Sequence, residues 1–369
     1  MINNKWLQLY KHIKQNHSGL LPSITFSGLL IKKVELLKEQ FSDLNTTDNP
    51  QHNDWLEHEA FTSVFSNLIR NMTVSKTDID FLYETLMAAQ LCQLALSIVN
   101  NHKQVLETDD LAFKTGVIYQ KLGDYEHSKE KLEEALSINP LNDQAACYLG
   151  LNYMYTGETE HSISLLKKSI EINPNNAAGY QNLAGLYYQE SEFEKSAELC
   201  EGVFVLNKSI TAAYITAISS YLALNNIGYA ERWIQRSISN NISSMELVRL
   251  AGISAHKAER YSESIEALSH YLSVYPESFD VLAIRARSKI ALGLWSELEP
   301  DLKQLLSFDA HDVWVLEQLF LTHFHTKKWS EARVVMSELK KLGGTFKITY
   351  RNEIDAINQA LSIEVLEID

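Results

Sequence analysis

The sequence predicts an all-α solenoid, a stack of helix pairs in which each pair packs only against its neighbours. A 34-residue period runs from Asp109 to Phe346 as seven windows in phase, without an insertion. Small residues and glycines recur at fixed positions of the period, and prolines recur near its end. A period of this length is typical of two-helix units that must stack, because one unit cannot bury its apolar face alone.

Two positions of the window explain how each helix pair is joined. Position 8 is small in five repeats, and we expect the two helices of a repeat to cross closely there. Position 15 ends the first helix, where glycine adopts the required positive φ most easily. The residues at position 8 are Gly116, Gly150, Ala184, Gly252 and Ala286. The glycines at position 15 are Gly123, Gly157 and Gly293.

The second helix has its own pattern. Position 17 carries a large apolar side chain that we expect to pack back over the turn. Position 32 carries proline in three repeats, and proline ends a helix because it has no N–H. The residues at position 17 include Tyr125, Phe193, Tyr261, Trp295 and Trp329. The prolines are Pro140, Pro174 and Pro276.

The windows Asp109–Asn142 and Asp143–Asn176 carry the pattern most fully, and in these residues the chain resembles the tetratricopeptide repeat family. The resemblance implies a right-handed α-solenoid of helix-turn-helix repeats whose first helices line a concave groove. An unrelated helical bundle that mimics the period is the alternative. Later repeats depart from the family pattern at Ile218 and Phe320 in the small position, at Arg285 where the family prefers a core leucine, and at Lys208, Ile242 and Ala310 in place of proline.

The period also divides the chain into segments. Residues 1–74 are predicted to form an N-terminal helical region, with Trp6, Leu9 and Ile13 on one helix face. Residues 75–108 have the length of a repeat but poor content, so they form either a degenerate repeat or one long helix. Residues 109–346 hold the seven tetratricopeptide repeats. Residues 347–369 are expected to form a C-terminal capping helix, which covers the last exposed face of the stack, and an acidic tail.

Composition restricts the partner and the compartment. The net charge of −14 argues against nucleic acid as a partner, because phosphate binding needs a basic surface. The three cysteines, Cys92, Cys147 and Cys200, are widely spaced, which argues for reduced thiols rather than disulfides or zinc. The first residues lack a signal peptide, and no apolar run reaches 18 residues, so we expect a cytoplasmic protein.

Motifs that carry chemistry are not found. The sequence holds no phosphate-binding glycine loop, no nucleophile elbow and no CxxC pair. His58 and Glu59 begin a zinc-protease motif that lacks its second histidine. His323 and His325 are two residues apart, so on a helix they point in different directions. We therefore expect a protein that is not an enzyme and uses no cofactor or metal.

The resemblance places candidate binding residues on the first helices, at positions 2, 5, 9, 12 and 13. The first zone is apolar and aromatic, and the second holds three cations in an otherwise acidic chain. The first zone consists of Phe113, Val117, Cys147, Leu151, Met154, Tyr155, Gln181, Tyr188, Ile215 and Leu222. The second consists of Glu246, Arg249, His256, Lys257, Arg287, Trp314, Glu317, Phe324 and His325. The alternative is that some of these residues pack against neighbouring repeats or the N-terminal helices.

This pattern suggests capture of a protein or peptide, with apolar anchors in the first zone and an acidic segment or C-terminal carboxylate in the second. The Lys, Arg and Asn clamp by which some family members hold chaperone tails is absent, because Phe113, Cys147 and Gln181 stand at inward positions. The asparagine ladder of family members that glycosylate proteins is also absent, with Asn182 as its only rung.

The predicted function is therefore a protein–protein interaction scaffold or adaptor. A peptide-responsive regulator and a membrane-associated assembly factor are the alternatives, and so is an accessory subunit of an enzyme encoded elsewhere. The membrane alternative depends on the basic amphipathic segment around Lys5, Trp6 and Lys11, which could lie on an anionic membrane. We favour the interpretation that this segment packs on the stack as an N-terminal cap.

Overall fold

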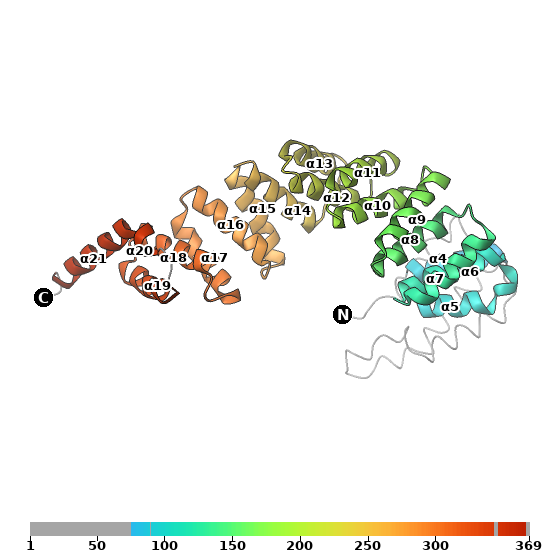
Figure 1. Ribbon diagram of the computed structural model, residues 1–369, viewed down its shortest axis with the longest axis horizontal. Coiled ribbons are helices and arrows are strands. Elements are labelled where there is room, and N and C mark those ends of the chain that lie inside the picture. The colour runs from blue at the N-terminus through green and yellow to red at the C-terminus, as the bar shows by residue number, and fades with distance from the viewer. Residues whose placement is uncertain (1–74, 89, 343–345, 367–369) are drawn as a thin grey trace, which may run out of the picture. The chain divides into compact units, whose positions relative to one another are not determined.

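The computed structural model describes residues 75–88, 90–342 and 346–366, and in these ranges the chain consists of helices and short turns without a strand (Figure 1). The predicted N-terminal helical region, including Trp6 and Lys11, lies outside the described residues. Within these ranges, no helix has both the length and the apolar composition needed to cross a membrane.

Residues 76–101 form a pair of helices, α4 (Lys76–Ala88) and α5 (Cys92–Asn101), that contact each other. A short 3-10 turn, η3 (Lys103–Val105), leads from this pair to the first full repeat.

The seven repeats follow the predicted register. The second helix of every repeat begins at position 17 of its window. The first helices are α6 (Thr108–Lys121), α8 (Asp143–Tyr155), α10 (Ala177–Gln189), α12 (Thr211–Ala223), α14 (Met245–Lys257), α16 (Phe279–Ala291) and α18 (Val313–His325). The second helices are α7 (Tyr125–Ile138), α9 (Thr159–Ile172), α11 (Phe193–Leu206), α13 (Ile227–Ser239), α15 (Tyr261–Val274), α17 (Trp295–Phe308) and α19 (Trp329–Leu342). The fold is thus an all-α helical-repeat solenoid, as predicted.

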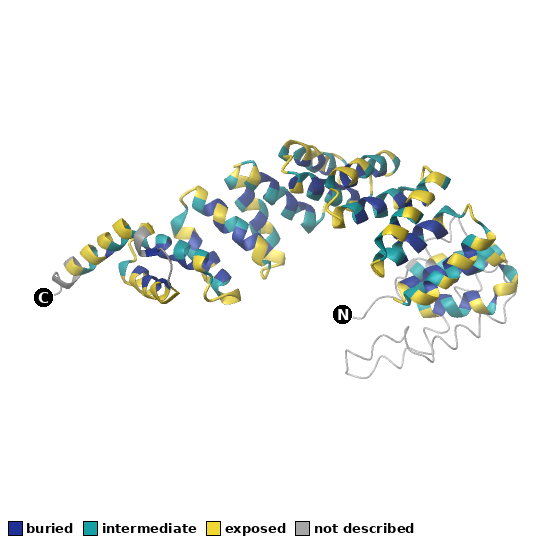
Figure 2. Cartoon of the chain, in the orientation of Figure 1, coloured by how far each residue is buried: buried dark blue, intermediate teal, exposed yellow. Residues whose placement is uncertain are grey.

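The chain divides into two compact units, a first unit up to Leu186 and a second unit from Tyr187, with the division inside α10. In the first unit, α6 contacts both α7 and α8. In the second unit, α14 contacts the first helices before and after it, α12 and α16. The first helices of successive repeats therefore lie side by side within each unit. Figure 2 shows buried and exposed residues alternating along these helices, as expected when one face of each helix packs on its neighbours.

The small residue at position 8 lies where the two helices of a repeat cross. A Cβ added to Gly116 would lie 2.7 Å from Leu132 Cγ, and one added to Gly252 would lie 2.4 Å from Leu268 Cδ2. Both leucines are fully buried. The expected close crossing is confirmed at these repeats, because an added methyl group would require the buried leucine of the second helix to shift.

The turn at position 15 has the same backbone in every repeat, whether or not glycine is present. Its residue has φ between 54° and 81° in all seven repeats. In the first repeat the backbone N–H of Asp124 donates to the carbonyl of Tyr119, the bond that closes a Schellman motif. The residues in this conformation are Gly123, Gly157, Ser191, Asn225, Glu259, Gly293 and Lys327.

Arg285, which replaces the expected core leucine, is part of a buried ionic network in the sixth repeat. Its Nε and Nη2 atoms donate to the two carboxylate oxygens of Asp301 at 3.0 and 2.9 Å. The Nζ of Lys289 lies 3.0 Å from the same carboxylate and donates to the carbonyl of Glu297 at 2.9 Å. The Asp301 side chain is only 3% exposed. Two cations sharing one buried carboxylate thus replace the apolar contact of other repeats.

The last repeat is covered by two further helices, α20 (Phe346–Thr349) and α21 (Arg351–Leu366). Ile357 of α21 is fully buried, and Ile354 and Leu361 pack against the same core cluster. Phe320 fills the position that is small in five other repeats, and its ring centroid lies 5.1 Å from that of Phe346. The large residue is accommodated here because its partner is the terminal cover.

Candidate protein-binding surface on the first helices

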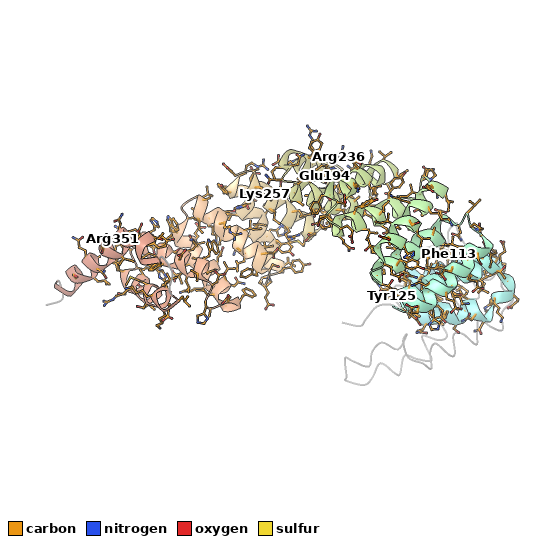
Figure 3. The ribbon with its side chains drawn as sticks, viewed as in Figure 1. Phe113, Tyr125, Glu194, Arg236, Lys257 and Arg351 are labelled. Atoms are coloured by element: carbon orange, nitrogen blue, oxygen red, sulfur yellow. The ribbon has the colours of Figure 1, made fainter. Side chains whose placement is uncertain are left out.

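The candidate residues of the first unit lie on α6, α8 and α10 and differ in how far they reach solvent. Phe113, which is labelled in Figure 3, is half-buried. It packs edge-to-face on Tyr148, with ring centroids 5.9 Å apart. Tyr155 is 55% exposed, and its ring lies 5.2 Å from that of Tyr125. Leu151, Met154 and Gln181 are half-buried. Aromatic and aliphatic side chains with partial exposure are suited to receive an apolar anchor.

Cys147 belongs to the core rather than to the surface. Its side chain is buried, and Nδ2 of Asn182 donates to its Sγ at 3.3 Å. Burial raises the pKa of the thiol above its ordinary value. Cys147 and Cys200 are both buried and form no disulfide. Cys147 can support a binding surface from beneath but offers little area to a ligand.

In the second unit the apolar candidates are Tyr188, Ile215 and Leu222. Tyr188 is exposed, and its ring lies 5.4 Å from that of Phe193. Ile215 is half-buried on α12. Leu222 is buried at 6% exposure, so it resembles Cys147 in supporting the helix row from within.

Arg249 is already paired within the protein. Its Nε and Nη2 atoms donate to the two carboxylate oxygens of Glu246 at 2.9 and 2.6 Å. Its Nη1 also lies 3.4 Å from Asp280 Oδ2. The pKa of Arg249 is raised, first by the hydrogen bond to Glu246. A guanidinium held by two carboxylates is a poor site for a further anion.

Arg287 and Lys257 have a different environment. The Arg287 guanidinium lies over the Trp314 ring, 5.0 Å from its centroid, and neither cation pairs with a carboxylate among the described residues. Lys257, labelled in Figure 3, donates only to the neutral side-chain oxygen of Asn225 at 3.3 Å. Both side chains are exposed. These two cations are therefore available to an anionic group.

His256 connects α14 to α16 between these cations. Its Nδ1 lies 2.8 Å from Ser288 Oγ, and its ring packs edge-to-face on Tyr261. Burial lowers its pKa, and the charges of Arg287 and Lys257 lower it further. A neutral imidazole next to two cations leaves a locally positive surface at neutral pH.

The remaining aromatic candidate of the second unit is Phe324 on α18. It is half-buried and packs edge-to-face on Trp329, with ring centroids 5.7 Å apart. The neighbouring His325 stacks on Trp295 at 4.2 Å. The repeated aromatic at position 17 thus fixes the end of the first helix, as the sequence pattern predicts.

The comparisons agree with this repeat geometry. The tetratricopeptide repeat model matches residues 111–140 and 144–176, the first two full repeats. The match identifies these two segments as tetratricopeptide repeats. No curated protein matches it.

Two solved structures are similar to this chain. The chain is similar to PilF of Pseudomonas aeruginosa, with 13% identity over 60% of this chain and 99% of that one, and a TM-score of 0.52. It is also similar to a tetratricopeptide repeat protein of Parabacteroides merdae, with 17% identity, coverage of 68% and 98%, and a TM-score of 0.47. At these identities the likeness concerns the fold alone. Tetratricopeptide repeats support the general role of a protein-interaction scaffold.

Proposed function

We propose that the first helices of each unit bind segments of a partner protein, and that those of the second unit select segments with an acidic residue or a terminal carboxylate. The first unit would supply half-exposed apolar and aromatic contacts from Phe113, Leu151, Met154 and Tyr155. Such side chains contribute most of the binding energy when they are desolvated at the centre of an interface.

The observation that carries this proposal is the pair of cations, Arg287 and Lys257, without carboxylate partners among the described residues. The Arg287 guanidinium lies over the Trp314 ring, and a guanidinium in such a place can still offer its N–H groups to a planar anion. A carboxylate there would gain charge-assisted hydrogen bonds. Arg249 contributes less, because Glu246 and Asp280 already neutralise it.

The test is selection of random displayed peptides with free C-termini on the full-length protein, followed by affinity measurement on synthetic copies. We expect Arg287→Ala with Lys257→Ala to weaken binding of an enriched acidic peptide by at least about tenfold. Arg333→Ala with Lys340→Ala removes the same charge from α19, where both side chains are exposed, and serves as the matched control. Equal weakening by both double variants would leave only a general charge effect and contradict the proposal.

A further inference from the structure

Two turns between repeats of the second unit lie side by side. Residues 274–280 lead from α15 into α16, and residues 308–313 lead from α17 into α18. The rings of Phe279 and Phe308 are in edge-to-face contact, with centroids 5.7 Å apart. Nε2 of Gln304 donates to the carbonyl of Pro276 at 2.6 Å. We call these two segments the turn pair.

The turn pair exposes an unusual amount of apolar side chain. Two aromatic rings that contact each other still remain partly in water, and three more large side chains in the same segments are about half exposed. The exposed fractions are 51% for Val274, 48% for Tyr275, 41% for Phe279, 46% for Phe308 and 49% for Val313. The corresponding turn after α9, residues 172–177, reads INPNNA and carries no aromatic residue. Clustered apolar exposure of this kind marks interaction surfaces more often than isolated exposed residues do.

The charges of the turn pair all have one sign. The two segments contain Glu277, Asp280, Asp309 and Asp312, and neither contains Lys or Arg. Asp312 caps α18 by accepting the N–H of Val315, and Asp280 lies 3.4 Å from Nη1 of Arg249. Asp309 accepts the N–H of His311, and no ion pair of Asp309 is found among the described residues. The two segments that expose the apolar side chains thus also carry carboxylates and no lysine or arginine.

We propose that the turn pair is a second docking surface, for a protein segment that presents bulky apolar side chains flanked by lysine or arginine. Charge complementarity selects this occupant, because the carboxylates attract basic flanks while the aromatic rings take the apolar anchors. The same carboxylates oppose a second copy of the chain at this face and an anionic membrane surface. This surface lies at the turns rather than on the row of first helices, so a partner held there leaves that row available.

The proposal is tested with the full chain and three dye-labelled synthetic peptides of equal length. The first peptide carries Trp and Leu flanked by Lys, the second carries the same apolar residues flanked by Glu, and the third carries the Lys residues with Ser in place of Trp and Leu. Fluorescence anisotropy at physiological salt should show saturable binding of the first peptide that Phe308→Ser abolishes, whereas any binding of the second or third peptide should be unchanged in Phe308→Ser. Absence of binding of the first peptide, or a Phe308-dependent binding of the second or third peptide equal to that of the first, would overturn the proposal.

Variants then locate the site. Phe308→Ser should abolish binding of the first peptide, and Glu277→Lys with Asp309→Lys should weaken it by at least about tenfold. Glu198→Lys with Glu266→Lys makes the same charge change at exposed positions of α11 and α15 and should leave the affinity within about twofold. A comparable loss of affinity in this control variant would show a non-specific charge effect and contradict the proposal. A dimer by sedimentation that Phe308→Ser dissociates would instead assign the face to self-association.

Discussion

In the buried ionic network of the sixth repeat, removing the carboxylate of Asp301 should destabilise the protein more than removing the guanidinium of Arg285. Replacing Asp301 with Ala leaves both Arg285 and Lys289 without the carboxylate that they share. Removing one partner of a buried ion pair costs about 3–5 kcal/mol, because the remaining charge stays buried and unpaired. Replacing Arg285 with Ala should cost only about 1–2 kcal/mol, since Lys289 still holds Asp301.

The assay must follow this repeat rather than the whole chain, because solenoids unfold in parts. Hydrogen exchange of the amides of α16 and α17, read as a function of urea, reports the local free energy of opening. Asp309→Ala, which removes an exposed carboxylate from the adjacent turn, should change it by less than about 0.5 kcal/mol. A cost for Arg285→Ala equal to or above that for Asp301→Ala would refute the shared-carboxylate reasoning.

Four further predictions concern packing, the turn and pH. Gly252→Ala should lose about 1–3 kcal/mol in urea denaturation, because its Cβ would meet Leu268. Lys327→Gly should gain about 1 kcal/mol, because φ is 59° there. The pKa of Glu299 is lowered to about 2, so the stability that its carboxylate contributes is fully present above the ordinary pKa of 4.5 and is lost as the pH falls towards 2. Glu299→Gln should therefore lower the free energy of unfolding by about 1 kcal/mol near pH 7. In acid-denaturation curves, wild type and variant should converge near pH 2. The pKa of His256 lies below its ordinary value of 6.5, so the unfolded state binds more protons than the folded state as the pH is lowered. The free energy of unfolding should therefore decrease as the pH falls from about 7.5 to about 5.5, and it should decrease less steeply in His256→Gln.

Matched controls separate these effects from general damage. Gly228→Ala adds a Cβ where no atom lies within 4 Å and should be neutral or stabilising. Gly293→Ala places a Cβ at φ 66° and should destabilise the turn that Lys327→Gly relaxes. Glu297→Gln removes an exposed carboxylate from the same helix as Glu299 and should leave the acid-denaturation curve unchanged. Stabilisation by Gly252→Ala would contradict the close helix crossing at Leu268. Destabilisation by Lys327→Gly would contradict the strained backbone conformation at the turn.

The sequence period predicts the repeat fold because both depend on local chemistry. A small residue recurs at position 8 in five repeats and an aromatic residue at position 17 in five repeats, and this constant spacing locates the second helices. Non-glycine residues such as Glu259 and Lys327 give no sequence signal for positive φ, although the neighbouring helices impose it. The fold was therefore predictable from one-dimensional spacing, while several turns depended on tertiary context.

Individual side-chain partners were less predictable. Arg285 looked like a packing defect because its partner Asp301 lies 16 residues away on the second helix of the same repeat. Arg249 looked like a free cation, although Glu246 stands three residues before it at the spacing of a helical ion pair. Burial of Cys147 and Leu222 depends on how neighbouring repeats pack, which position in the window does not specify.

Site-specific photo-crosslinking of the bound partner segment tests the central claim most directly. A photoreactive amino acid placed at Ile253 on α14 probes the row of first helices, and one at Glu266 on α15 probes the second helices. We expect the acidic peptide enriched on the full-length protein to crosslink from position 253 and not from position 266. Crosslinking from position 266 alone would contradict binding on the first helices.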